Sequence, residues 1–363
     1  METHNSISEA AVLNALRQVM DPELKKDLVS LNMIKDIRID GGTIRFTLVL
    51  TTPACPLKKE LTDASRSAVL ALPGVDEVVV ETTANVPSAK SLPDKAPIRN
   101  VRNTIAVASG KGGVGKSTVS VNLALGLAKS GARVGILDTD LYGPSIPMMM
   151  GVKKPLQATG SQKLVPVENH GVQLVSVGFM LDEETPLIWR GPMVMQLVKQ
   201  FLTDVEWEAL DYLVIDLPPG TGDAQLTLVQ TIPLTGAVVV TTPQDVALID
   251  ARRAIKMFQK VNVPIIGIVE NMSSFTCPHC GETTEIFSGG GGEKTSERYQ
   301  VPFLGTIPID LKIREGGDEG KPIVIAEPSS PQTEAFVAIS EKVAATISVL
   351  DMADNRPESQ VNP

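Results

Sequence analysis

A glycine-rich stretch at residues 110–118, GKGGVGKST, has the residue types and spacing of a phosphate-binding loop. It fits G-x-x-x-x-G-K-[ST], in which glycines let backbone N–H groups converge on phosphate oxygens and the lysine reaches the β and γ phosphates of a nucleotide. The hydroxyl that follows the lysine is a ligand for Mg²⁺. The sequence therefore predicts a nucleotide site with Ser117 on the magnesium. Its expected contacts are Gly110, Gly112, Gly113, Val114, Gly115, Lys116, Ser117 and Thr118.

Two aspartates are candidates for the acidic side chains that phosphoryl transfer needs near the metal and the attacking water. Asp216 ends the apolar run YLVID, and ligands of open α/β sheets lie beyond the carboxyl ends of strands. Asp140 follows a second such run and is better placed than Asp138 to orient the water. We expect Lys116, Asp140 and Asp216 to act in catalysis, although aspartates at such positions also cap helices and form turns.

The stretch CPHC places Cys277 and Cys280 on one tight turn. Two thiolates are half of what a closed tetrahedral site requires. Two copies of the chain meeting at a two-fold axis would bring four thiolates together, which suits a [4Fe–4S] cluster and equally a zinc ion. The spacing alone does not choose between them, and the bare motif favours zinc. His279, between the cysteines, is expected to be a loop residue.

The elements that must position these residues follow from the hydrophobic pattern. Short apolar runs rich in β-branched residues recur through residues 101–350, at TIAVAS, RVGILD, VQLVSV, YLVIDL, AVVVTT, PIIGIVE and PFLGTI. Helical or loop stretches separate most of them, a pattern typical of a parallel sheet covered on both faces. The fold class predicted for this region is therefore an α/β P-loop NTPase with a mostly parallel sheet between layers of helices.

A smaller α+β domain is expected at residues 1–84. Apolar residues between 12 and 19 recur at helical spacing, DGG indicates a hairpin, and TIRFTLVL alternates as a half-buried strand should. Residues 85–100 contain three prolines and no periodic apolar pattern, so they are predicted to be a linker that cannot bury itself. Residues 351–363 are predicted to be a polar tail.

The composition restricts the setting. The chain of 363 residues has a formal net charge of −9, which argues against a nucleic-acid partner bound by general phosphate attraction. Three cysteines do not form a disulfide framework, and the N-terminus has no secretory signal pattern. No apolar run approaches the length of a membrane span. We expect a cytoplasmic protein with neither a membrane nor a nucleic-acid partner.

A second lysine in the glycine-rich loop gives the first resemblance to a known group. Lys111 directly follows the first glycine, and with the runs DTD and DLPPGTGD this pattern resembles the deviant Walker A ATPases of the MinD and ParA type. In that group the first lysine reaches the nucleotide of the opposite subunit. The resemblance therefore implies that Lys111 binds ATP and acts in catalysis across a homodimer.

A more specific resemblance covers residues 100–350. The stretches GKGGVGKST, DTDLYGPS, WRGPM, DLPPGTGD, ENMSSFTCPHCG and GTIPID resemble the Mrp/ApbC family of iron–sulfur cluster carrier ATPases, and the first domain is similar to one found in iron–sulfur assembly factors. The resemblance implies a labile [4Fe–4S] cluster on Cys277 and Cys280 of both subunits, transferred to apo-proteins after loading from a donor or scaffold. It also places the adenine against Asn271, with Pro308 and Asp310 nearby. Thr139 departs from the small apolar residue expected between the two aspartates.

Two alternatives remain at this point. A MinD- or ParA-like positioning ATPase is disfavoured because the last thirty residues hold one lysine and one arginine against five acidic residues, without a basic amphipathic helix. A dimeric ATPase with a structural zinc, acting as a scaffold, is the stronger rival, since only metal analysis separates it from a carrier. Cys55, before a predicted helix, is either a reactive thiol or a half-buried packing residue.

Overall fold

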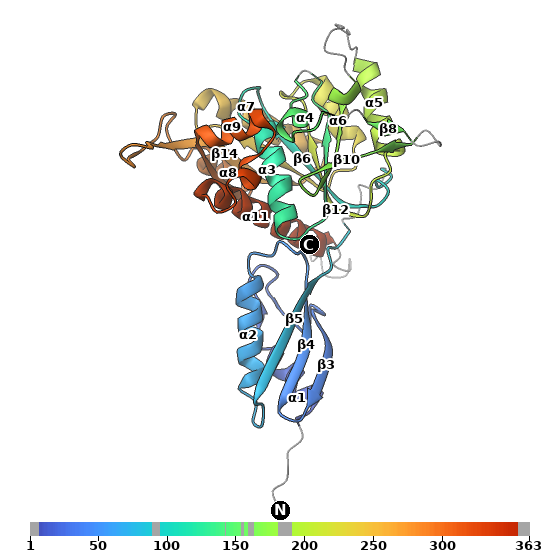
Figure 1. Ribbon diagram of the computed structural model, residues 1–363, viewed down its shortest axis with the longest axis vertical. Coiled ribbons are helices and arrows are strands. Elements are labelled where there is room, and N and C mark those ends of the chain that lie inside the picture. The colour runs from blue at the N-terminus through green and yellow to red at the C-terminus, as the bar shows by residue number, and fades with distance from the viewer. Residues whose placement is uncertain are drawn as a thin grey trace, which may run out of the picture. The chain divides into compact units, whose positions relative to one another are not determined.

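The structure is a computed structural model of the chain, and it describes residues 7–88, 95–141, 143–153, 156–158, 163–180 and 191–354. The described residues form two compact units, one within residues 1–87 and 344–363 and the other within residues 88–343 (Figure 1). Among the described helices, none has the length and apolar character that a membrane span requires.

The first unit contains a three-stranded sheet, in the order β3-β4-β5, and two helices. Ile44, Phe46, Leu48 and Leu50 alternate on the buried side of β4, as the sequence predicts. The strand pairs antiparallel with β3 through the hairpin and parallel with β5 through the helical crossover. The elements are α1 (Glu9–Leu16), β1 (Met20–Asp21), β2 (Lys26–Asp27), β3 (Ile34–Asp40), β4 (Thr43–Leu50), α2 (Lys58–Leu70) and β5 (Glu77–Ala84).

The second unit is built on a nine-stranded sheet. Its path is β10-β11-β7-β12-β6-β13-β14-β15, with β16 also beside β14, and every pairing is parallel except those of β10 and β15. The strands are β6 (Val101–Ser109), β7 (Val134–Asp138), β10 (Val167–Asn169), β11 (Val172–Ser176), β12 (Leu210–Asp216), β13 (Gly236–Thr241), β14 (Ile265–Thr276), β15 (Thr283–Thr284) and β16 (Phe303–Ile309); β8 (Gln157–Ala158) and β9 (Leu164–Val165) form a separate ribbon.

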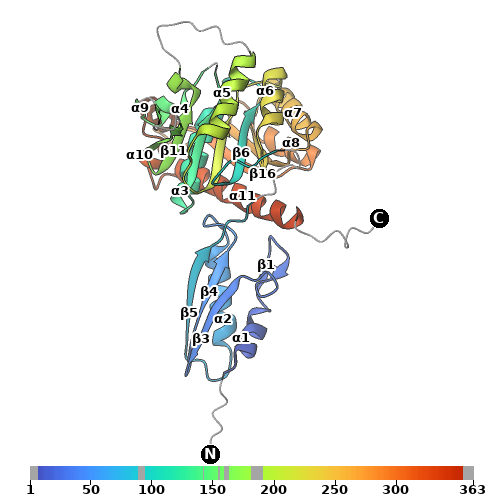
Figure 2. The ribbon, with the colours of Figure 1, turned by 90° about the vertical axis from the view of Figure 1, so that its right-hand side faces the viewer.

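Helices cover both faces of this sheet, which confirms the predicted fold class. Figure 2 shows α5, α6, α7 and α8 on one side and α3, α4, α9 and α10 on the other. The helices are α3 (Lys116–Lys129), α4 (Ile146–Met149), α5 (Gly191–Asp204), α6 (Asp223–Thr231), α7 (Asp245–Lys260), α8 (Gly291–Tyr299), α9 (Leu311–Glu319), α10 (Ile323–Ala326) and α11 (Pro331–Asp354), with a 3₁₀ turn at Val177–Met180. Strands β6, β12 and β13 are buried along nearly their whole length, as their apolar sequences require.

Two segments outside the predicted domains hold more structure than the sequence pattern indicates. Ile98, in the predicted linker, is buried in the core of the second unit, and the Lys95 ammonium donates to the carbonyls of Val229 and Ile232 at the end of α6. Residues 95–100 are therefore anchored, because carbonyls at a helix C-terminus attract a cation. Helix α11 continues to Asp354 and so includes the start of the predicted tail. The sequence pattern also missed the short strands β8, β9, β10 and β15.

Candidate functional site

The glycine-rich loop connects β6 to α3, at the carboxyl end of the central strand of the sheet. Gly113 and Gly115 have φ values of +80° and +82°, a backbone conformation that favours glycine. At Gly110, a Cβ atom would overlap the backbone of Asp250 on α7. The glycines are thus needed by the backbone itself, and Gly110 holds the loop directly against α7.

Lys116 brings the two predicted aspartates together. Its Nζ lies 2.6 Å from Asp216 Oδ2 and 3.3 Å from Asp140 Oδ2, and its side chain is 6% exposed. Ser117 Oγ donates to the same Asp216 oxygen at 2.7 Å. The ends of β7 and β12 and the start of α3 therefore place a lysine, a hydroxyl and two carboxylates within hydrogen-bonding reach of one another.

A second hydroxyl fixes the other oxygen of Asp216. Ser120 Oγ donates to Asp216 Oδ1 at 2.6 Å, so both carboxylate oxygens are held from one face of α3. Ser120 was not among the residues predicted from the sequence. Its position four residues after Lys116, on the same face of the helix, is the signal that could have found it.

Asp138 is fully buried behind these groups. Ser176 Oγ on β11 donates to its Oδ2 at 2.7 Å, and the Asp140 backbone N–H donates to its Oδ1 at 3.1 Å. Burial, followed by the nearby Asp216 charge, raises the pKa of Asp138 to about 8. The folded chain therefore favours the protonated form of Asp138 more strongly than the unfolded chain does. Sequence reasoning gave no signal for Ser176, which lies on another strand.

Thr139, the residue that departs from expectation, has a structural role. Its backbone N–H and its hydroxyl both donate to the Asp216 carbonyl, at 3.0 and 2.8 Å. The side chain thereby ties the end of β7 to the end of β12. The hydroxyl stabilises the relative positions of the two predicted catalytic aspartates.

A cavity of about 330 Å³ opens above these residues, lined by the glycine-rich loop, Lys116, Ser117, Thr118, Asp140 and Pro219. The hydroxyl and carboxylate oxygens at its base are ligands of the kind that Mg²⁺ prefers. The converging amides and the N-terminus of α3 suit phosphate. Lys111 does not line this cavity; it is half-buried and forms no ion pair within the described part of the chain.

Two consecutive residues in the middle of β14 contact the glycine-rich loop and the segment beyond the cysteines. Asn271 Nδ2 donates to the Val114 carbonyl at 2.9 Å and lies against Gly115. The neighbouring Glu270 is fully buried and accepts from the backbone N–H of Gly292 at 2.5 Å and of Gly290 at 3.3 Å. Glu270, like Ser120 and Ser176, was not predicted from the sequence, because nothing in its local pattern marks it.

None of the three predicted adenine neighbours, Asn271, Pro308 and Asp310, lines the cavity. Asp310 caps α9, accepting from the Lys312 N–H at 2.7 Å and from Gln332 Nε2 at 2.7 Å. Pro308 is half-buried near the end of β16. Of the three residues, only Asn271 contacts the glycine-rich loop.

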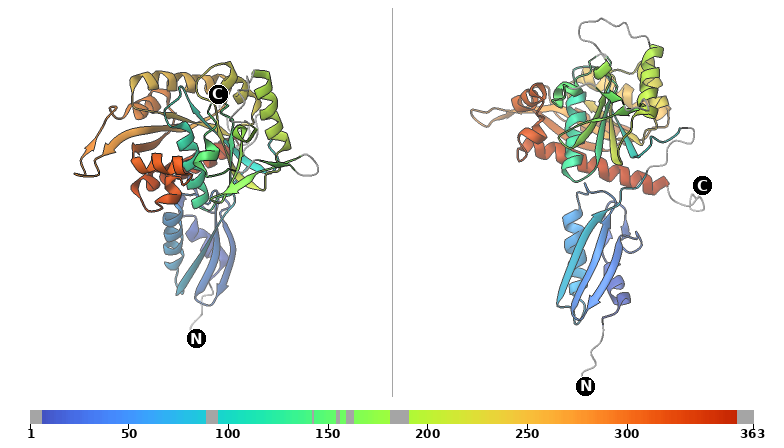
Figure 3. Two further views of the ribbon diagram at one scale, coloured as in Figure 1. Left: turned by 45° about the horizontal axis from the view of Figure 1, so that its top comes forward. Right: turned by 45° about the vertical axis from the view of Figure 1, so that its right-hand side comes forward.

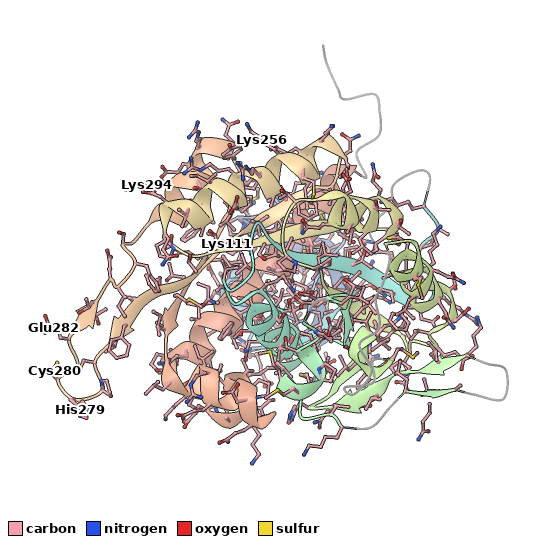
Figure 4. All side chains as sticks on the ribbon, turned by 90° about the horizontal axis from the view of Figure 1, so that it is seen from above. Lys111, Lys256, His279, Cys280, Glu282 and Lys294 are labelled. Carbon is pink, nitrogen blue, oxygen red and sulfur yellow. The ribbon has the colours of Figure 1, made fainter. Side chains whose placement is uncertain are left out.

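The cysteines occupy a hairpin that extends from β14 beyond the rest of the sheet (Figures 3 and 4). The Cys277 N–H donates to the Glu282 carbonyl and the Gly281 N–H to the Cys277 carbonyl, both at 2.9 Å, which closes the turn. Figure 4 shows Cys280 and His279 at its tip. Cys280 is exposed and Cys277 half-exposed, so both sulfurs are accessible from outside.

The turn also prepares a thiolate. The backbone N–H groups of Cys280 and His279 lower the pKa of the Cys277 thiol. Among the described residues, no cluster of three or more His, Cys, Asp or Glu side chains could hold a metal ion. Within the described part of the chain, the hairpin therefore offers two sulfur ligands at this site.

Cys55 precedes α2 and is half-buried against the core of the first unit, as a packing residue would be. Trp189 and Arg190 of the WRGPM stretch, and Tyr142 of DTDLYGPS, lie outside the described residues.

Comparison with known families agrees with both units. A family model described as NUBPL iron-transfer P-loop NTPase matches residues 100–344. A second, described as iron–sulfur cluster assembly protein, matches residues 9–81. The resemblance inferred from the motifs is thereby confirmed.

Individual proteins extend the comparison over nearly the whole chain. The iron–sulfur cluster carrier protein of Synechocystis is 53% identical over 344 residues, covering 93% of this chain and 98% of its own. That of Escherichia coli is 43% identical over 340 residues, covering 93% and 92%. An iron–sulfur cluster transfer protein NUBPL of Dictyostelium discoideum is 49% identical over 271 residues, covering 74% and 84%.

Solved structures match the second unit. A nucleotide-binding protein from Archaeoglobus fulgidus in complex with ADP is 40% identical, covers 66% of this chain and 93% of its own, and superposes with a TM-score of 0.58. The cell-division ATPase MinD of Pyrococcus furiosus is 25% identical, covers 66% and 98%, and has a TM-score of 0.50.

Proposed function

The chain belongs to the family of NUBPL iron-transfer P-loop NTPases, and we propose that it is an ATP-hydrolysing carrier of a labile [4Fe–4S] cluster. In this proposal Cys277 and Cys280 of two copies hold the cluster between them and pass it to apo-proteins. The observation that carries the proposal is the contrast within one chain between a well-formed phosphate cavity and a cysteine hairpin with only two sulfur ligands.

Each part of the cavity has a role in the proposed reaction. Lys116 exchanges its contacts with Asp216 and Asp140 for phosphate oxygens, and the loop amides bind the same oxygens. Ser117 and Asp216 would hold Mg²⁺, and the ion would supply charge neutralisation at the transferring phosphoryl group. Asp140, fixed through its backbone by Asp138, orients the water.

Other predicted residues complete the nucleotide site in this proposal. Lys111, which has no ion-pair partner within the described part of its own chain, reaches the nucleotide of the opposite copy, so hydrolysis is slow until the dimer forms. Asn271 contacts the adenine from its position on β14 against the loop, with Pro308 and Asp310 contributing from the end of the neighbouring strand.

The hairpin supplies half of the cluster site. Backbone N–H groups favour the Cys277 thiolate, the form that binds iron. Because the remaining ligands come from another copy, a change in dimer geometry weakens the site without unfolding either chain. The partners are then a cluster donor or scaffold and recipient apo-proteins in the cytoplasm. The net charge of −9 disfavours nucleic acid as a partner.

The test is anaerobic purification followed by counts of iron, acid-labile sulfide and zinc per dimer, for the parent and for the variant Cys277→Ala/Cys280→Ala. The matched control is Cys55→Ala, which removes the one other cysteine. The proposal expects about four irons and four sulfides per dimer in the parent and the control, and none in the double variant.

The same measurement tests the alternative of a structural zinc ion. About one zinc per dimer that persists through reconstitution with iron and sulfide would describe a dimeric ATPase with a structural zinc, and the carrier proposal would be rejected.

A further inference from the structure

A second polar cavity, of about 290 Å³, lies between α7, α8 and the loop at residues 288–291. Its charged lining is mainly basic. Arg252 comes from α7, and Lys294 and Arg298 are four residues apart on one face of α8. Asp245 is the one carboxylate that lines the cavity, and the Glu285 carboxylate lies against Gly289 in its wall, so the three cations outnumber the nearby carboxylates.

These cations are not neutralised within the described part of the chain. The ion pairs there include none made by Arg252, Lys294 or Arg298. The Nε of Arg252 is buried and has no hydrogen-bond partner. A buried donor without an acceptor is unfavourable, and the described part of the chain supplies no acceptor for this atom.

The helix N-terminus is not the source of the attraction. The buried Glu270 carboxylate already accepts the N–H groups of Gly290 and Gly292 from the inner side. The basic side chains therefore define the ligand. They present guanidinium and ammonium donors, which bind carboxylate or phosphate oxygens.

The cavity lies beside both functional regions of this unit. Its loop wall directly follows the cysteine hairpin in the chain. Its α7 wall contacts the glycine-rich loop, since a Cβ at Gly110 would overlap the backbone of Asp250. A molecule docked here would touch the segment leading to the cysteines.

The adjacent surface of α7 is apolar. Val246 and Ile249 are 61% and 46% exposed, and each is one residue from a cavity-lining residue, about 100° further round the helix. Exposed apolar side chains beside a charged cavity match a protein interface, in which apolar contacts lie next to charge-complementary pairs. A free inorganic ion bound in the cavity would not contact these apolar side chains.

We propose that this cavity receives a carboxylate side chain from an acidic segment of a protein that exchanges the cluster with this carrier. The part concerning cluster exchange rests on the proposed function. The carboxylate binds Arg252 and Arg298, and apolar residues of the same partner cover Val246 and Ile249.

The test compares two variants with the same change in net charge. Lys294→Glu/Arg298→Glu reverses two cations of the cavity, whereas Lys256→Glu/Lys260→Glu reverses two exposed cations of α7 outside it. Figure 4 shows Lys294 and Lys256 on these two helices. The probe is a fluorescein-labelled peptide of eight glutamates, titrated by anisotropy against the full-length protein without cluster. We expect binding to weaken about tenfold in the cavity variant and less than about twofold in the control.

Three results would overturn the proposal. Equal weakening in both variants would show general charge attraction, and absence of peptide binding to the parent at low salt would show no site. Complete displacement of the peptide by millimolar inorganic phosphate would assign the cavity to a small ion.

The link to cluster exchange has its own readout. Transfer from the loaded carrier to an apo-ferredoxin should slow about tenfold in the cavity variant, with dimerisation and ATP hydrolysis retained. Loss of dimerisation would make a second copy the occupant and reject the partner assignment. Peptide binding is measured on protein without cluster. If the iron analysis rejects the carrier proposal, the peptide result still tests the cavity.

Discussion

The nucleotide cavity and the cysteine hairpin are opposite kinds of site on one sheet. Lys116, Asp138 and Asp216 are buried, and serine hydroxyls donate hydrogen bonds to both aspartates, so these carboxylates are positioned before any ligand arrives. Cys277 and Cys280 sit on an exposed turn with two of four ligands. A preorganised site favours catalysis, whereas a site divided between molecules favours release of what it holds.

The largest expected effect comes from a dimer in which only one of the two chains keeps Cys277 and Cys280. A heterodimer of the parent with Cys277→Ala/Cys280→Ala, isolated by two affinity tags, should hold no cluster although it keeps one intact pair of thiols. Two sulfur ligands do not retain a four-iron cluster. Iron and sulfide analysis of the purified heterodimer makes the measurement, with the doubly tagged parent dimer as control. If the heterodimer held half as much iron as the parent dimer, each chain would bind its own metal. The cysteine hairpin would then not be a site divided between two molecules.

The second effect concerns the buried site. Lys116→Ala should lower the rate of ATP hydrolysis at least about 100-fold, because the transition state loses its charge partner. Lys129→Ala, at the exposed end of the same helix, serves as the control and should hydrolyse ATP within about twofold of the parent. The count of iron per dimer should be the same in all three proteins.

A loss of cluster in Lys116→Ala alone would change this interpretation. It would mean that the nucleotide loop is required to assemble the hairpin site, and that the two regions are one structural unit.

The sequence predicted the parts of this comparison that local spacing encodes. The glycine-rich loop, Asp140 and Asp216 at strand ends, and the alternating β4 all follow from short patterns, and the structure places the loop and both aspartates around Lys116. The hydrophobic pattern likewise identified the strands that form the interior of the sheet.

Residues that act through distant partners could not be predicted in this way. Ser176 reaches Asp138 across 38 positions, and Glu270 holds glycines about 20 residues further along the chain. Their roles depend on which strands become neighbours, and a single sequence does not show this. Ile98 lay in a proline-rich stretch, where composition concealed one buried side chain.

The third effect is a pH dependence that belongs to the buried site. The pKa of Asp138 is raised from 3.8 to about 8, so the folded state binds this proton more tightly than the unfolded state. The free energy of unfolding therefore falls as the pH rises from about 4 towards 8 and levels off above, with a slope of at most about 1.4 kcal/mol per pH unit. In Asp138→Asn, which keeps the shape of the neutral form, this slope should disappear. Urea denaturation at pH 6, 7 and 8 measures it.

Ser176→Ala is the companion variant. It removes the hydroxyl that stabilises the charged carboxylate, so the pKa should rise further and the slope should persist to higher pH. An unchanged slope in Asp138→Asn would assign the pH dependence to another group.

The smallest expected effect tests whether the two regions communicate through β14. Asn271 and Glu270 are consecutive, and their side chains contact the glycine-rich loop and the loop beyond the cysteines. Glu270→Gln removes the charge and one of the two acceptors while keeping the size of the side chain. We expect the ratio of cluster release rates with and without ATP to fall about fivefold, a loss of roughly 1 kcal/mol of coupling.

Glu293→Gln is the control, since Glu293 is exposed in the first turn of α8 and neutralising it makes the same change in net charge. Its release ratio should equal that of the parent. A ratio that survives in Glu270→Gln would mean that β14 carries no coupling. The nucleotide cavity and the cysteine hairpin would then communicate only through the contact between two copies, where Lys111 and the hairpins are proposed to meet.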